Sequence, residues 1–272
     1  MRLARVILPL VLASTASAAA AAPAVLLPHR AVYDLALDSA SDRSGITGIE
    51  GRMVYEFNGT PCEGYTVTFR FVTRIATGEA SRMTDQQTTT YEDGKGASFS
   101  FSTRSFIDSQ LDKELRGNAR IGAQDTTVAI ERPQRETVTL EKTQFPTQHL
   151  LELIGKAESG ETFYETTLFD GSEDADKVMT TTVVIGRQAP VRANDPEREA
   201  IEDLREDRFW PVDIAYFDLS EADGEEFPTY RISFKLHESG VTRDLVMDYG
   251  DFSMTGTLVD LSMFDASATC TD

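Results

Sequence analysis

"GRMVYEFNGTPCEGYTVTFRFVTRI", residues 51–75, alternates apolar and polar side chains on both sides of a short turn. In an extended chain, one face of its second half collects the apolar side chains Tyr65, Val67, Phe69, Phe71 and Ile75. A period of two over so many residues is typical of a strand with one buried and one solvated face. The residues of "NGTPCEG" favour a turn, so the segment predicts a β-hairpin with Cys62 near its tip.

The same alternation continues along the chain. Strand-like segments flank predicted turns at residues 93–96, 132–134 and 170–176, and Phe99 and Phe101 share one strand face. We count about a dozen short strands at hairpin spacing, which indicates one antiparallel β architecture. No Pro/Ser-rich linker or change of composition divides the chain, so we expect residues 23–272 to form a single domain.

One segment, "FPTQHLLELIGKAESG" at residues 145–160, lacks the strand period. Pro146 and Thr147 are typical of a helix start, and either Gly155 or Gly160 is suited to its end. Between them Leu150, Leu151, Leu153 and Ile154 crowd together. We therefore predict a helix that includes Thr147–Ile154 and packs against an apolar sheet face. The acidic stretch 194–210 is interpreted as a short helical turn or an exposed loop.

The N-terminus indicates export. Arg2 and Arg5 precede the apolar run Val6–Leu12, and the small residues Ala16–Ala18 resemble a cleavage site. This order is that of a secretory signal peptide, which we assign to residues 1–22. The alternative is an uncleaved anchor. We expect the mature protein in the periplasm, without a lipid anchor, because no cysteine follows the apolar run, and without a further membrane-spanning segment.

The charge of the chain argues against nucleic acid as a partner. The sequence has 45 acidic and 26 Lys or Arg residues, a formal net charge of −19, and removal of Arg2 and Arg5 makes the mature chain more negative. Such a charge repels nucleic acid and anionic lipid headgroups. We therefore expect no nucleic-acid binding.

The two cysteines, Cys62 and Cys270, stand near opposite ends of the mature chain. Disulfides form and persist in an oxidising compartment, so we predict a Cys62–Cys270 bridge, with two free thiols as the alternative. Neither residue belongs to a Cys-x-x-Cys pair, which favours a structural bridge over a redox-active one.

Motifs for catalysis or cofactor binding are absent from the sequence. The three histidines His29, His149 and His237 do not have the spacing of paired metal ligands, and no nucleophile motif or glycine-rich phosphate loop occurs. The acidic stretch 170–177 lacks the order of a calcium loop and is interpreted as a solvated turn. We expect no metal, no cofactor and no enzyme activity; a triad assembled from scattered residues is the alternative.

Four stretches together resemble the EipB family of periplasmic proteins from alphaproteobacteria: "LLPHRAVYDLAL" (26–37), "SGITGIEGRMVYEFNGTPCEGYTVTFRFVTRI" (44–75), "FPTQHLLELI" (145–154) and the late Cys270. The resemblance extends over residues 27–272. It implies a mostly β fold, a single spiral or half-open-barrel antiparallel sheet of about 12–14 strands, with one packed α-helix and a bridge equivalent to Cys62–Cys270. It also implies a role in cell envelope integrity and no enzyme activity.

Two classes of function follow from these observations. The first is a binding protein, because a curved sheet with an apolar face can hold a periplasmic protein partner or, alternatively, a lipid-like or lipoprotein ligand in an apolar cavity. The candidate lining residues are Tyr65, Val67, Phe69, Phe71, Phe99, Phe101, Leu150 and Leu153. The second, less favoured class is a hydrolase of an envelope polymer. We expect a monomer.

Overall fold

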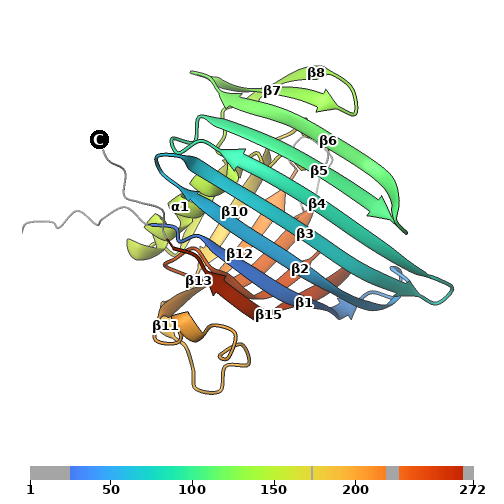
Figure 1. The fold of residues 1–272 in the computed structure, drawn as a ribbon, viewed down its shortest axis with the longest axis vertical. Coiled ribbons are helices and arrows are strands. Elements are labelled where there is room, and N and C mark those ends of the chain that lie inside the picture. The colour runs from blue at the N-terminus through green and yellow to red at the C-terminus, as the bar shows by residue number, and fades with distance from the viewer. Residues whose placement is uncertain (1–24, 173, 219–226, 266–272) are drawn as a thin grey trace, which may run out of the picture.

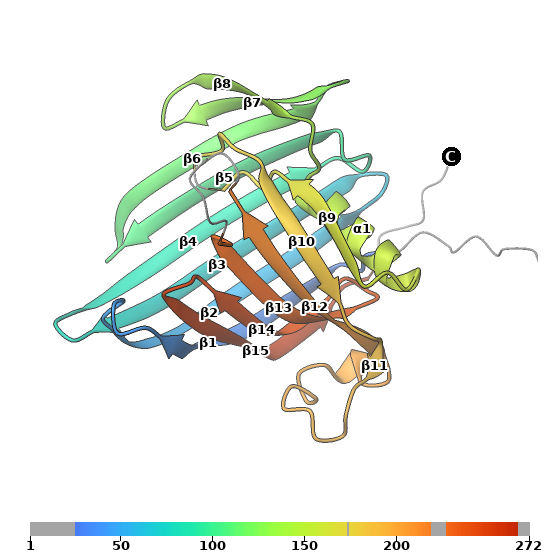
Figure 2. The ribbon, with the colours of Figure 1, turned by 180° about the vertical axis from the view of Figure 1, so that it is seen from behind.

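The computed structural model describes residues 25–172, 174–218 and 227–265. These residues contain one antiparallel sheet of 15 strands, in the order β8-β7-β6-β5-β4-β3-β2-β1-β15-β14-β13-β12-β10-β9, with β11 paired to β12 (Figures 1 and 2). The first eight strands are β1 (His29–Ala40), β2 (Ile46–Thr60), β3 (Gly64–Thr77), β4 (Ser81–Glu92), β5 (Ser98–Ile107), β6 (Gln110–Ile121), β7 (Asp125–Arg132) and β8 (Glu136–Glu141). The others are β9 (Phe163–Leu168), β10 (Met179–Ile185), β11 (Ala189–Pro190), β12 (Arg208–Phe217), β13 (Tyr230–His237), β14 (Thr242–Asp248) and β15 (Phe252–Met263).

The hairpin predicted from residues 51–75 is confirmed. Strands β2 and β3 pair from Ile46 opposite Thr77 to Thr60 opposite Gly64, and Cys62 lies in the turn between them. Gly64 has a φ of +82°, a backbone conformation that side chains with a Cβ rarely adopt. Gly64 therefore permits the turn conformation at the start of β3, and the next residue, Tyr65, is buried.

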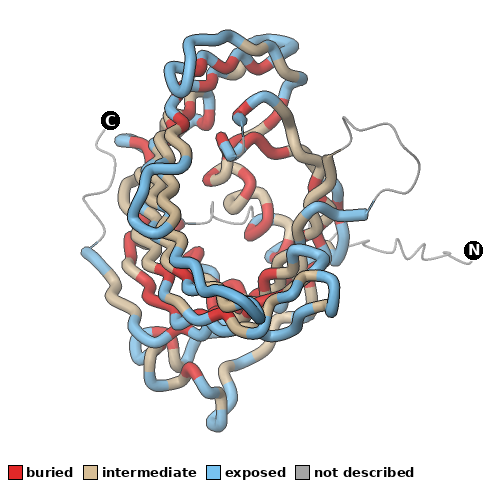
Figure 3. The backbone as a smooth tube through the Cα atoms, turned by 90° about the vertical axis from the view of Figure 1, so that its right-hand side faces the viewer, coloured by how far each residue is buried: buried red, intermediate tan, exposed pale blue. Residues whose placement is uncertain are grey.

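The first and last strands lie side by side, because β1 pairs with β15 from His29 opposite Met263 to Ala40 opposite Phe252. Pairing of the two ends of the described chain joins the early hairpins to the late ones in one continuous sheet. The sheet curls without closing, since β8 and β9 stand at its two ends and do not pair with each other. Figure 3 shows the curl, which confirms the predicted mostly β, half-open architecture.

The strand count exceeds the expected 12–14. One reason is β11, which has only two residues and so shows no alternation in the sequence. The predicted Cys62–Cys270 bridge stays a prediction, because Cys270 lies outside the described residues. The signal peptide assigned to residues 1–22 also lies outside them.

Helix α1 (Pro146–Glu158) confirms the predicted helix and extends it by one turn. It lies on the concave side of the sheet (Figures 1 and 3). Gly160, with a φ of +80°, ends it: the Gly160 N–H donates to the Ala157 carbonyl and the Glu161 N–H to the Lys156 carbonyl. Gly155 lies inside the helix.

Four phenylalanines pack β5 against the end of β9, across the concave side of the curled sheet. Phe99 and Phe101 come from the inner side of β5, Phe145 precedes α1, and Phe169 follows β9. The ring centroids of Phe99 and Phe145 are 5.2 Å apart, and those of Phe101 and Phe169 are 5.8 Å apart. Stacked and edge-on rings at these distances stabilise the contact beyond their buried area. The end of β9 is thus attached to β5 by side-chain packing, without strand pairing.

The segment between β11 and β12 distinguishes the two interpretations of the acidic stretch 194–210. It contains the short helical turn η1 (Glu202–Leu204), which confirms one of the two interpretations. It is not merely an exposed loop, because Ile201, Leu204 and even Glu197 are buried. The segment lies outside the concave space that holds α1 (Figures 1 and 2). Because most residues of this segment are charged or polar, the few buried residues that attach it to the sheet could not be recognised from the sequence.

Candidate binding surfaces

The inner face of β3 carries the apolar row predicted from the sequence. Tyr65 is buried in the main core, whereas Val67, Phe69 and Phe71 pack against that core and remain half-buried. The rings of Phe69 and Phe71 stack with their centroids 5.9 Å apart. The row therefore presents apolar surface that the protein itself covers only in part.

Strand β4 interrupts the expected apolar face. Its inward positions are polar, with Thr88 opposite Phe69 and Gln86 opposite Phe71. Beyond β4, Phe99 and Phe101 are fully enclosed in the second cluster with Phe145 and Phe169. The eight predicted lining residues thus do not form one surface. The run of threonines in β4 gave no alternation from which its inner face could have been recognised.

Helix α1 covers the other part of the inner face. Leu153 is buried in the main core, and Leu150 is half-buried against it. The helix is attached to β4 through the buried carboxylate of Glu92, which accepts hydrogen bonds from the backbone N–H groups of Thr147 (2.7 Å) and Gln148 (3.0 Å). The first N–H groups of a helix have no partner within it, so Glu92 supplies the cap that Phe145 does not. Burial raises the pKa of Glu92 to about 7, although both hydrogen bonds act in the opposite direction.

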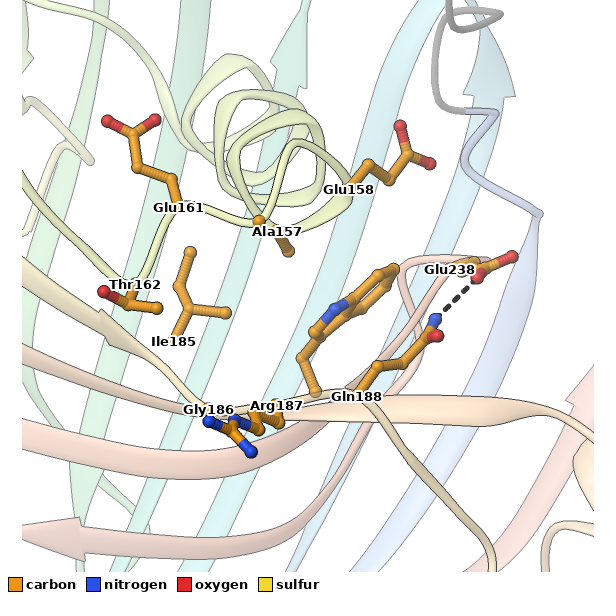
Figure 4. A pocket seen from close by; sticks show the side chains of 11 residues that line it. Ala157, Glu158, Glu161, Thr162, Ile185, Gly186, Arg187, Gln188 and Glu238 are labelled. Atoms are coloured by element: carbon orange, nitrogen blue, oxygen red, sulfur yellow. Dashed lines mark hydrogen bonds between the residues drawn. The ribbon is translucent and has the colours of Figure 1, made fainter.

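A pocket of about 590 Å³ opens where α1 ends (Figure 4). It is lined by residues of the helix end, the β10–β11 connection, β12 and the β13–β14 turn: Ala157, Glu158, Gly160, Glu161, Thr162, Ile185, Gly186, Arg187, Gln188, Trp210 and Glu238. We call it the helix-end pocket. Buried Trp210, Ile185 and Ala157 supply its apolar part, and the charged residues are more exposed. Trp210 is the only tryptophan in the chain.

The polar groups of the helix-end pocket are partly paired with one another. The Gln188 side chain donates to the Glu238 carboxylate at 2.8 Å, and Lys156 forms an ion pair with Glu161 at 2.9 Å. Glu158 and Arg187 are exposed. An apolar base within a ring of donors and acceptors can bind a side chain and its flanking peptide groups, which is an arrangement typical of protein interfaces.

Each of the three histidines has a structural environment. His29 is buried and shares a hydrogen bond of 2.8 Å between its Nδ1 and the Leu27 carbonyl, whereas His149 on α1 faces Thr181 with 3.4 Å between Nε2 and Oγ1. His237 Nε2 accepts a hydrogen bond from Arg243 Nε at 2.9 Å. Burial lowers the pKa of all three, to about 4 for His149 and His237. All three rings are therefore neutral at pH 7.

A buried charge cluster attaches the 191–207 segment to the sheet. The Arg243 side chain is fully buried, and its Nη1 lies 3.0 Å from carboxylate oxygens of both Asp195 and Glu197. Glu197 also accepts hydrogen bonds from the backbone N–H groups of Asp244 (3.0 Å) and Leu258 (2.7 Å). These groups lie where β14 and β15 cease to pair, so the carboxylate replaces the missing ladder bonds.

Within residues 25–172, 174–218 and 227–265, no group of three or more His, Cys, Asp or Glu side chains is placed to hold a metal ion. In the same part of the chain, no helix has the length and apolar character needed to cross a membrane.

Few features of the sequence indicated the polar residues that position these surfaces. Glu92 ends a strand of threonines and glutamines, Glu197 is one of many acids in its segment, and Trp210 follows a phenylalanine without a motif. Only Arg243 had a signal, since it stands between the apolar residues Val241 and Leu245 on a strand. A charge at such a position indicates a buried partner elsewhere in the chain.

Comparisons with known proteins agree on one family. Residues 19–265 match the family described as EipB-like. The chain is 55% identical over 255 residues to the cell envelope integrity protein EipB of Brucella abortus (strain 2308), covering 93% of this chain and 90% of the relative. It also superimposes on the crystal structure of a β-barrel-like protein of domain of unknown function DUF1849 from Brucella abortus. That match has a TM-score of 0.86 and 54% identity, and covers 89% of this chain and 100% of the other.

Proposed function

Because the chain belongs to the EipB-like family, we propose that it maintains the integrity of the cell envelope by binding a protein partner in the periplasm, without catalysing a reaction. The first part of this proposal rests on the relative from Brucella abortus, which is named a cell envelope integrity protein and is 55% identical to this chain. The compartment rests on the signal peptide predicted for residues 1–22.

The helix-end pocket is the observation that carries the proposal of a protein partner. Its volume of about 590 Å³ is enough to admit more than one side chain, and it combines Trp210 with exposed charges of both signs. Aromatic residues surrounded by a polar rim dominate the energetics of protein interfaces. The pocket lies at the end of α1, so a bound partner would contact both the helix and the late strands.

The lack of catalysis is supported by the state of the histidines. A general base needs a lone pair within reach of a substrate proton. His29, His149 and His237 are each at most 5% exposed and lie outside the helix-end pocket. The pocket itself contains glutamates, an arginine and a glutamine, which suit recognition through hydrogen bonds.

A lipid-like ligand is the second candidate, because Val67, Phe69 and Phe71 form a half-buried apolar row on the inner face of β3. An acyl chain laid along this row would cover surface that the protein leaves in contact with water. Each buried CH₂ group would contribute about 0.8 kcal/mol.

Affinity capture from periplasm distinguishes these candidates from each other. We expect the wild-type protein to retain a specific protein, and the double variant Glu158→Lys/Arg187→Glu to lose it while unfolding at the same temperature. Thr68→Lys, on the outer face of β3, is the matched control and should retain it. Capture that is the same for the wild type and the double variant would contradict the role of the pocket.

Native mass spectrometry of the same preparations tests the lipid-like ligand. The second candidate predicts that lipid co-purifies with the wild type and is absent from Phe71→Asp. If this is observed and no specific protein is captured, the ligand is lipid-like and the proposal of a protein partner is wrong. Phe71→Asp places a charge at an apolar site, so its folding must be verified by thermal unfolding.

A further inference from the structure

The outer face of the early strands contains a second depression, distinct from the helix-end pocket. Its volume is about 450 Å³, and it crosses β3 to β7. Eight of its lining residues carry polar side chains that alternate with inward-facing ones: Thr66, Thr89, Tyr91, Ser100, Ser102, Arg116, Asn118 and Glu131. We call it the outer groove. Four strand spacings separate β3 from β7, which gives the groove a length of about 19 Å.

Tyr91 provides a flat aromatic surface in the outer groove. Its hydroxyl donates to the Glu63 carbonyl at 2.9 Å, and its side chain is packed so closely over Gly64 that a Cβ there would lie 2.6 Å from the hydroxyl oxygen. The ring is therefore held in place, yet the residue is 41% exposed. A fixed and exposed ring can stack on the C–H face of a ligand at little cost in side-chain entropy.

A chain of hydrogen bonds crosses the other half of the groove. Ser100 Oγ donates to Asn118 Oδ1 at 2.8 Å, and Asn118 Nδ2 donates to Glu131 Oε1 at 3.4 Å. Arg116 Nε lies 2.8 Å from the other oxygen of Glu131. These contacts orient side chains from three strands, whose remaining donors and acceptors face solvent.

The balance of charge and polarity selects the class of ligand. Arg116 and Glu131 neutralise each other, and the chain as a whole carries a net charge of −19, which disfavours an anion. An apolar ligand would bury the polar groups of the groove, which would lose their hydrogen bonds to water and gain none from the ligand. Hydroxyl groups, which both donate and accept, match the hydroxyl, amide and paired ionic groups of the groove.

We propose that the outer groove binds an uncharged polysaccharide chain, with the C–H face of a sugar ring on Tyr91 and sugar hydroxyls on Ser100, Asn118 and Arg116. The chain would run across the strands, in the direction of the groove. This site is independent of the helix-end pocket and of the inner face of β3, and it would attach the protein to a glycan of the envelope while the other surfaces remain free.

Calorimetric titration of the mature chain with soluble β-1,4-linked oligomers of N-acetylglucosamine and of glucose tests the proposal. We expect saturable binding of at least one oligomer. Tyr91→Ala should weaken it about tenfold or more, and Asn118→Ala about 2- to 12-fold, as expected for the loss of an aromatic contact and of a hydrogen bond. Tyr91→Phe keeps the ring and should retain most of the affinity.

The matched control is Tyr249→Ala, which removes a tyrosine of similar exposure, 40%, in the turn between β14 and β15. It should leave oligomer binding unchanged. No saturable binding of either oligomer by the wild type, or an equal loss in Tyr249→Ala, would overturn the proposal.

Discussion

Two buried glutamates attach α1 and the 191–207 segment to the sheet. Glu92 accepts hydrogen bonds from two backbone N–H groups at the start of α1, on the inner side of the sheet. Glu197 accepts from two backbone N–H groups of β14 and β15 and joins them to the 191–207 segment. The geometry is similar, but Glu197 also forms an ion pair with Arg243, whereas no ion pair of Glu92 occurs among the described residues.

The comparison shows that two buried glutamates with similar hydrogen bonds can differ in how strongly their removal, or a change of pH, affects stability. Burial raises the pKa of both carboxyls, to about 7 for Glu92. The charge of Glu197 is balanced by Arg243, which is itself fully buried, so removal of Glu197 leaves that guanidinium with Asp195 as its remaining carboxylate partner. The charge of Glu92 is balanced only by the dipoles of backbone N–H groups. Its pKa therefore stays near 7, and the carboxyl gains or loses its proton near neutral pH.

The largest effect is expected from Glu197→Ala. The substitution leaves Arg243 with an incomplete set of partners and two buried backbone N–H groups without acceptors. Breaking a buried pair in this way costs about 3 to 5 kcal/mol. The free energy of unfolding from urea titrations measures it. A loss below about 1 kcal/mol would mean that the segment is attached by its apolar residues alone.

Leu153→Ala tests how much the apolar packing of α1 contributes to stability, independently of the hydrogen bonds from Glu92. Leu153 is 1% exposed, so its truncation should lower the free energy of unfolding by about 2 to 4 kcal/mol. Leu150→Ala, at a half-buried position of the same helix, should cost less than half as much. Equal losses at the two positions would contradict the packing of the helix described above.

Glu92→Gln tests the pH response. The unfolded carboxyl ionises near 4.5 and the folded one near 7, so the stability that protonated Glu92 contributes is complete below pH 4.5 and is lost as pH rises through 7. Between pH 4.5 and 8, the wild type should therefore lose about 2 to 3 kcal/mol relative to the glutamine variant, which does not titrate. Urea titrations of both proteins across this range measure the difference. Parallel pH profiles would show that Glu92 ionises normally in the folded state.

Arg52→Ala gives the smallest expected effect and serves as the reference for a solvent-exposed ion pair. Arg52 Nη2 lies 2.6 Å from Asp34 Oδ1, but the two side chains are 61% and 51% exposed. Exposed pairs contribute about 0 to 1 kcal/mol, and the effect should shrink further at high salt. A loss similar to that of Glu197→Ala would remove the distinction between buried and exposed charges.

The strands were predictable from the sequence because their alternation is local. Tyr65, Val67, Phe69 and Phe71 indicated an inward face before any partner strand was known. Pro146 indicated the start of the helix, whereas its end was left open between Gly155 and Gly160. The sequence did not predict that Phe99 and Phe101 lie in a cluster separate from the apolar residues of β3. It depends on Phe145 and Phe169, which reach them only because the sheet curls.

The buried charges were hidden for a related reason. An acid in a polar segment usually faces solvent, and nothing near Glu197 in the sequence reveals Arg243, which is 46 residues away. Likewise, the helix-end pocket combines Ala157, Ile185 and Trp210, which come from three elements. Such sites require the topology of the whole sheet.

Complementation of a strain that lacks the gene tests most directly the central claim, that the protein acts by binding and not by catalysis. The variants are His29→Gln, His149→Gln, His237→Gln and Glu158→Lys/Arg187→Glu, each first shown to unfold at the wild-type temperature, and the readout is growth in detergent. We predict that every folded histidine variant restores growth and that the pocket variant does not. A folded histidine variant that fails, beside a pocket variant that restores growth, would contradict the account.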